Sequence, residues 1–69
     1  MRLKELREDR DLTQAQIADM LNCKQNTYQQ YESEKRQLPI QALIKLCEFY
    51  NISADYILGL PKGLEYPER

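Results

Sequence analysis

The 69-residue chain contains no histidine and no tryptophan, and it has only two cysteines and two glycines. Histidine is a frequent general base and the commonest metal ligand, so its absence removes the usual centre of an active or metal site. Cys23 and Cys47 form no C-x-x-C pair, which predicts reduced core side chains. The carboxylates are scattered along charged faces instead of forming a catalytic constellation. We therefore expect no enzyme activity, no metal and no cofactor.

The chain also lacks a long apolar run. A membrane-spanning helix needs about 20 consecutive apolar residues, and no stretch approaches that length. The start at Met1–Glu5 is charged and has no apolar segment of the kind that a signal peptide carries. We therefore expect a cytoplasmic protein without membrane contact.

Length and charge limit what this chain can do. A chain this short forms one domain with a thin core, because it buries only about 60% of its unfolded surface. Its residues are 42% hydrophobic and 30% charged, which is ordinary for a globular protein. The net charge is −1, so any binding to phosphate groups must rely on locally placed cations.

Apolar residues recur at helical spacing and show no strand-like alternation, which predicts an all-α chain of five short helices. The first is expected over about residues 2–10. The second follows Thr13, which can form a capping box with Gln16, and it stops at Asn22. The third is expected from residue 24 or 25 to residue 32.

The last two expected helices have equally clear boundaries. Pro39 suits the first turn of the fourth helix, which Asn51 closes. Four of its residues are expected to form a stripe facing the core: Ile40, Leu43, Ile44 and Cys47. Ser53 can cap a fifth helix that ends at Gly59. These signals predict a domain over residues 1–60 and an irregular tail over residues 61–69.

The third helix concentrates amide side chains on one side. At about 100° per residue, four of them fall within an arc of roughly 140°: Gln25, Asn26, Gln29 and Gln30. Tyr28 and Tyr31 lie on the opposite, packing side. An amide carries a donor and an acceptor side by side, which matches the N6 and N7 edge of adenine in the major groove. Periodicity alone leaves open a solvated helix that is simply rich in amides.

The order of elements around this helix resembles the helix-turn-helix of the lambda-repressor-like family, the Cro and xenobiotic-response-element type regulators. The matching residues lie between Leu3 and Gly59, in or beside all five expected helices: Leu12-Thr13-Gln14, Ile17-Ala18, Leu21, Tyr31-Glu32-Ser33, Lys35-Arg36, Ile52-Ser53 and Asp55-Tyr56-Ile57-Leu58. This resemblance implies a compact five-helix bundle with the second and third helices as the motif. It also implies a prokaryotic or phage transcriptional regulator, and we expect a repressor that binds double-stranded DNA.

The resemblance also implies roles for single residues. The helix from Gln25 to Glu32 is the expected recognition helix, with the four amides listed above reading base edges. Phosphate contacts are expected from five residues: Gln14, Lys24, Tyr28, Lys35 and Arg36. Arg7 and Glu32 match a semi-buried ion pair of the family, and Ala18 matches the small residue where the two helices of the motif cross. A homodimer formed through the fifth helix and the tail is expected on a palindromic operator, with recognition helices about 34 Å apart.

Several residues depart from the family pattern. Lys24 stands where serine or threonine usually caps the recognition helix, and Asn22 replaces a usual glycine. Tyr28 replaces a smaller aliphatic residue, so we expect it to be partly exposed. Glu34 adds negative charge close to the expected DNA. These departures leave an alternative open: a protein-interaction module, or an antitoxin, that keeps the same fold and binds an unknown protein partner.

Overall fold

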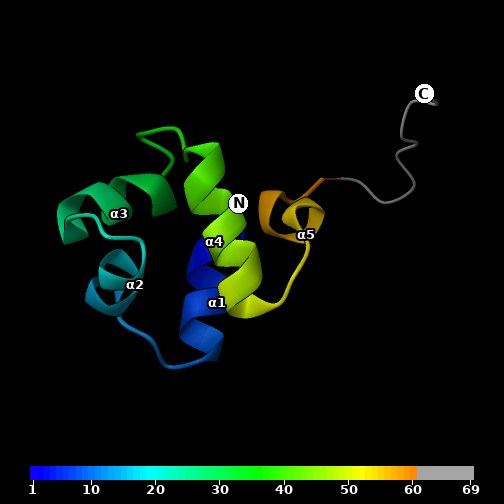
Figure 1. Ribbon diagram of the computed structural model, residues 1–69, viewed down its shortest axis with the longest axis horizontal. Coiled ribbons are helices and arrows are strands. Elements are labelled where there is room, and N and C mark those ends of the chain that lie inside the picture. Colours follow the sequence, from blue (N-terminus) through cyan, green and yellow to red (C-terminus); the bar gives the residue numbers. More distant parts are fainter. Residues whose placement is uncertain (61–69) are drawn as a thin grey trace.

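The computed structural model describes residues 1–60, and within this range the chain forms five helices and no strand (Figure 1). The helices are α1 (Leu3–Asp9), α2 (Gln14–Met20), α3 (Gln25–Glu32), α4 (Ile40–Tyr50) and α5 (Ala54–Leu58). The all-α fold expected from the sequence is confirmed. The expected irregular tail lies outside the described residues. None of the five helices is both long enough and apolar enough to cross a membrane.

Local signals set the helix ends where the sequence placed them. The Thr13 hydroxyl accepts a hydrogen bond from the Gln16 backbone N–H at 3.1 Å. The Gln16 side chain in turn accepts one from the Thr13 N–H at 2.8 Å, which completes the predicted capping box. The Ser53 hydroxyl caps α5 by accepting from the Tyr56 N–H at 3.4 Å. Asn51 ends α4 with a left-handed φ of 55°, a conformation that asparagine tolerates better than most residues.

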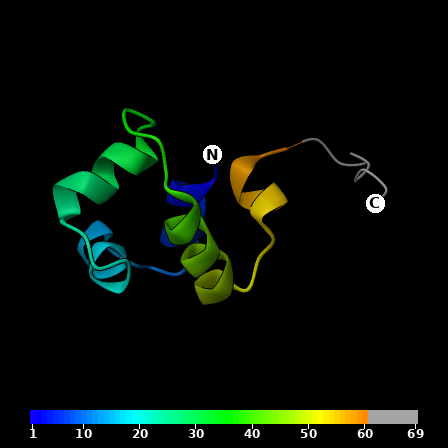
Figure 2. The same ribbon diagram turned by 45° about the horizontal axis from the view of Figure 1, so that its top comes forward.

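The helices α2 and α3 lie against each other on one side of the molecule. Both ribbon views place them beside the central pair α1 and α4, with α5 on the far side (Figures 1 and 2). Asn22 makes the tight turn between them with a φ of 59°. Ala18 is only 2% exposed in α2, as a close helix crossing requires. The expected helix-turn-helix arrangement is therefore present.

The core draws side chains from all five helices. Its buried members are Leu3, Leu6, Ile17, Ala18, Tyr28, Tyr31, Leu46, Tyr50 and Ile57. Three of these nine side chains are tyrosines, so aromatic rings fill much of the core in place of aliphatic groups.

The expected core-facing stripe of α4 was partly wrong. Ile40 and Ile44 are 75% and 52% exposed, whereas Leu46 and Tyr50 are almost fully buried. At 100° per residue, α4 is turned by roughly 60° from the expected orientation. Tyr50 has the largest buried side chain on that helix. The guanidinium carbon of Arg10 lies over its ring, 5.1 Å from the ring centroid. Burying this ring leaves one edge of the apolar arc outside the core.

Candidate nucleic-acid interface

The amide side chains of α3 form an uncharged outer face. Gln25, Asn26 and Gln29 are exposed, and Gln30 is half-buried at its margin. The first three, together with Gln14 of α2, line a shallow open hollow. No charged side chain lines it, so every hydrogen-bonding group that the hollow presents is an amide. Such a surface can pair with polar base edges but offers no ionic attraction to a phosphate.

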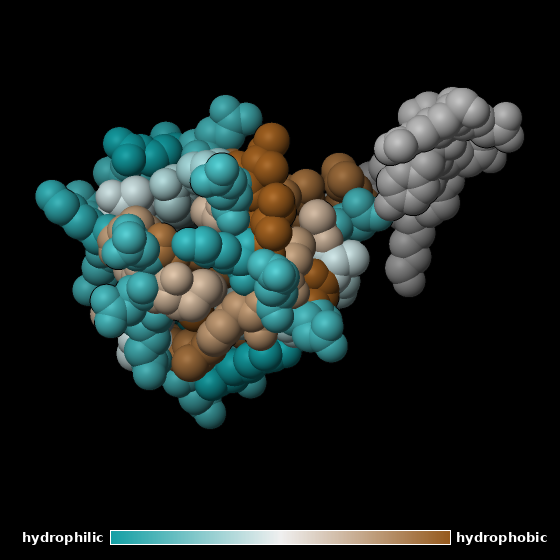
Figure 3. Space-filling view, in the orientation of Figure 1, coloured by the Kyte–Doolittle hydropathy of each residue, from teal (hydrophilic) through white to brown (hydrophobic). Residues whose placement is uncertain are grey.

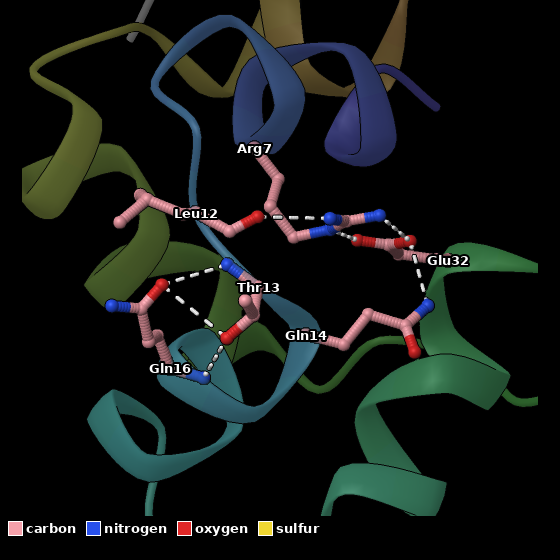
Figure 4. A network of polar contacts seen from close by, with 6 residues as sticks. All are labelled: Arg7, Leu12, Thr13, Gln14, Gln16 and Glu32. Carbon is pink, nitrogen blue, oxygen red and sulfur yellow. Dashed lines mark hydrogen bonds and ion pairs between the residues drawn. The ribbon is translucent and has the colours of Figure 1, made fainter.

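The expected ion pair between Arg7 and Glu32 is present and joins α1 to the end of α3 (Figure 4). The Arg7 Nε donates to Glu32 Oε2 at 2.7 Å, and a second guanidinium nitrogen donates to Oε1 at 3.2 Å. The two side chains are 13% and 6% exposed, so water screens this pair only weakly. A third Arg7 nitrogen donates to the Leu12 carbonyl at 2.9 Å. The pair therefore fixes α1 and the segment before α2 against the end of α3.

Gln14 joins the same network. Its Nε2 donates to Glu32 Oε1 at 3.1 Å, a contact between the start of α2 and the end of α3 (Figure 4). The two residues are 18 positions apart, and no local pattern predicts the contact. Gln14 was expected to contact phosphate. In the structure it links the buried ion pair to the amide-lined hollow.

The groups around Glu32 decide the titration of its carboxyl. Burial, the largest single effect, would raise the pKa, but the donor groups of Arg7, Tyr28 and Gln14 and the charge of Arg7 together outweigh it. The pKa is therefore held below its ordinary value of 4.5, and the group is ionised at neutral pH. The hydrogen bond to Glu32 and the charge of Glu32 raise the pKa of Arg7.

This shift predicts a loss of stability in acid. The Glu32 ion pair contributes fully above pH 4.5, begins to weaken as the unfolded carboxyl becomes protonated, and is lost below the lower pKa of the folded state. Urea unfolding from about pH 7 down to about pH 3 measures this contribution. The matched control replaces both partners, Arg7→Leu with Glu32→Leu, and should show a shallower decline. Parallel pH profiles for the two proteins would contradict the assignment.

The expected phosphate contact by Tyr28 was wrong. Its side chain is 0% exposed, whereas partial exposure was expected. Helical spacing puts Tyr28 on the side of α3 opposite the amides, and the core buries its whole ring. Burial and the nearby Glu32 carboxylate raise the pKa of the Tyr28 hydroxyl, so it stays neutral. Tyr28 is therefore a core residue of the motif.

Three cations expected to meet phosphates are exposed: Lys24, Lys35 and Arg36. Among residues 1–60, none of the three takes part in an ion pair. Lys24 precedes α3 and provides no side-chain cap, as its side-chain chemistry predicts. Arg36 lines a second hollow with Met1, Leu58 and Leu60, on the side facing α5.

The fold is that of a helix-turn-helix protein. The helix-turn-helix family model matches residues 3–57, most of the chain. The chain therefore belongs to the Cro/C1-type helix-turn-helix family, which consists of DNA-binding transcriptional regulators and not of enzymes.

Three curated relatives come from Bacillus subtilis (strain 168). The chain is 39% identical over 59 residues to the uncharacterized HTH-type transcriptional regulator YobD, covering 86% of this chain and 53% of the relative. It is 41% identical over 58 residues to the HTH-type transcriptional regulator ImmR, covering 84% and 46%. It is 34% identical over 61 residues to the HTH-type transcriptional regulator AnsR, covering 88% and 53%. The chain thus spans about half the length of the curated relatives it matches. No solved structure matches it.

Proposed function

We propose that this chain reads double-stranded DNA in the major groove, with α3 as the recognition helix, and acts as a transcriptional repressor. The observation that carries the proposal is the exposed, uncharged amide face of α3 around the hollow shared with α2. An α-helix fits the major groove, and an amide can bond two atoms of one adenine. Exposed positions in a chain that is 30% charged would otherwise be expected to carry lysine or glutamate.

Gln25, Asn26 and Gln29 are the proposed base-reading residues, with the half-buried Gln30 at the edge of the contact. Lys24 and Lys35 are exposed cations on either side of α3 and supply proposed phosphate contacts. Arg36 also lines the hollow beside α5. Its side chain therefore contacts either a DNA phosphate or this hollow, and not both at once. Few phosphate contacts and a net charge of −1 favour weak non-specific binding.

The direct test is selection of bound sequences from a random duplex pool at about 0.1 M salt, the ionic strength at which screening extends over about 10 Å. Enrichment of an inverted repeat with adenines in each half-site would support the proposal. Binding without any enriched sequence, fading at modest salt, would contradict it. That result would favour the alternative, a protein-interaction module or antitoxin with the same fold.

Replacing Gln29 with alanine should weaken binding to the selected site by about 1–3 kcal/mol, or roughly 5- to 150-fold in Kd. The loss should be confined to one operator position in each half-site, where the base preference relaxes. Binding to single-base operator variants measures this by fluorescence anisotropy. Gln41→Ala is the matched control, because Gln41 is an exposed glutamine on α4. An equal loss on every DNA sequence would contradict a base contact by Gln29.

We also propose that the protein binds its operator as a homodimer formed through α5 and the adjoining edge of α4. Four large apolar residues are exposed here: Ile40 and Ile44 on α4, Leu58 at the end of α5, and Leu60 just after α5. We call these four the α4–α5 apolar patch. Figure 3 shows apolar surface over the start of α4 that continues toward the end of α5. The tail, which was also expected to contribute, lies outside the described residues.

A second copy of the chain suits this patch. A two-fold interface joins the same surface on both subunits, so the surface must complement itself. Glu34 and Arg36 line the hollow beside Leu58 and Leu60 and carry opposite charges, and the exposed Glu34 carboxylate lies 3.6 Å from the Met1 amino group. A two-fold axis can therefore set the acid of one subunit against the base of the other, around an apolar centre.

Replacing Ile44 with lysine should shift the free protein from dimer to monomer, because the charge would be buried without a partner at the interface. Sedimentation equilibrium without DNA measures the shift. Gln41→Lys places the same charge at an exposed position of the same helix and should leave the dimer intact. A wild-type protein that is monomeric at all concentrations, or an Ile44 variant that remains dimeric, would contradict the proposed interface.

A further inference from the structure

The proposed function assigns base contacts to α3. The hydrogen bonds among Arg7, Glu32 and Gln14 point to one further base contact, from α2. We propose that Glu32 is a positioning residue for DNA recognition. Its carboxylate holds the Gln14 amide with the nitrogen inward, so that the Gln14 carbonyl oxygen accepts a hydrogen bond from the exocyclic amino group of adenine or cytosine. This inference rests on the proposed reading of DNA by the amide face.

The orientation of the Gln14 amide follows from the chemistry of its partner. An ionised carboxylate only accepts hydrogen bonds, so the amide nitrogen must face it. Gln14 Nε2 lies 3.1 Å from Glu32 Oε1, and a flipped amide would place two acceptor oxygens at that separation. Figure 4 shows the Gln14 oxygen turned away from Glu32. Among residues 1–60, the exposed Gln25 and Gln29 have no such partner to fix their amides.

Glu32 is itself held rigidly. Two nitrogens of Arg7 bind its carboxylate, and Arg7 is fixed in turn by the Leu12 carbonyl. The side chain of Glu32 is 6% exposed, so solvent offers it few competing partners. The hydrogen bonds therefore run from α1 through the end of α3 to Gln14, and the geometry of the last amide is set before any DNA arrives.

Gln14 is also in the right place to read a base. It lines the same hollow as Gln25, Asn26 and Gln29, the three exposed amides of α3. A carbonyl oxygen at this surface attracts a hydrogen-bond donor and repels a phosphate oxygen. In the major groove the base donors are the amino groups of adenine and cytosine, whereas guanine O6 and thymine O4 only accept. The fixed amide thus favours an adenine or cytosine at one position, in place of the phosphate contact expected from the sequence.

One experiment tests the orientation without DNA. The side-chain amide signals of Gln14 are assigned in the NMR spectrum by their loss in Gln14→Met. They should exchange with solvent more slowly than those of the exposed Gln41. In a variant that replaces both Arg7 and Glu32 with leucine, which leaves no unpaired charge, this protection should disappear. Gln14 signals that match Gln41 in the wild-type protein, or protection that survives in the double variant, would overturn the proposal.

A second experiment tests recognition. Selection from a random duplex pool is repeated with the wild-type protein, with Gln14→Met and with the double leucine variant. At one position per half-site, the preference for adenine or cytosine should fall by about fivefold or more in both variants, while preferences at the α3 positions remain. A uniform loss across all positions in Gln14→Met would overturn the base contact. A preference that survives in the double variant would overturn the role of Glu32.

The two experiments separate this inference from the function on which it rests. A wild-type protein that selects no sequence would overturn the DNA-reading function and the base contact together. The NMR comparison would still decide whether Glu32 holds Gln14. Normal selection by the wild-type protein with an unchanged Gln14→Met profile would overturn only the role of Gln14.

Discussion

Replacing Arg7 with leucine is expected to lower the free energy of unfolding by about 3–5 kcal/mol. The substitution leaves the Glu32 carboxylate, 6% exposed, with Gln14 as its remaining hydrogen-bonding partner in place of three N–H groups. Small domains have only about 5–15 kcal/mol of stability in total, so a loss of this size removes a large fraction of it. Urea unfolding followed by far-ultraviolet circular dichroism measures the loss.

The double replacement of Arg7 and Glu32 by leucine is the informative control. It removes the buried charge together with its partner, so it should be much more stable than Arg7→Leu alone. The difference between the variants separates the cost of an isolated charge from the net contribution of the pair. Equal stability of the single and double variants would show that Glu32 is not held as a buried charge.

Replacing Tyr28 with alanine should cost about 3–5 kcal/mol, because it empties a site that is 0% exposed. The ring belongs to the core that side chains from all five helices form. The cavity would lie directly under the amide face of α3, so DNA binding should fail together with folding. Thermal and urea unfolding of the free protein measure the loss of stability, and DNA binding below the unfolding midpoint measures the loss of recognition.

Tyr28→Phe is the matched variant, because it keeps the ring and removes only the hydroxyl. That hydroxyl lies near the Glu32 carboxylate but makes no hydrogen bond of good geometry among residues 1–60. Its removal should therefore change the unfolding free energy by no more than about 1 kcal/mol. A loss close to that of the alanine variant would mean that the hydroxyl, not the ring, stabilises the core, most directly through the neighbouring Glu32.

The sequence by itself determined the features that depend on neighbouring residues. Thr13 and Gln16 are three positions apart, so their capping box forms whenever that turn becomes helical. Asn22, Asn51 and Gly59 adopt the left-handed conformation at turns and helix ends because they tolerate it better than other residues. The amide face of α3 follows from helical spacing alone.

Only the tertiary structure decided which apolar residues of α4 are buried and which polar side chains form hydrogen bonds between helices. The arc on α4 is wider than the core beneath it, and burial of Leu46 and Tyr50 turned Ile40 and Ile44 outward. The bond from Gln14 to Glu32 joins the start of α2 to the end of α3, so it exists only after the two helices pack against each other. Periodicity shows which residues can share a face, but the packing of distant helices selects the face that is buried.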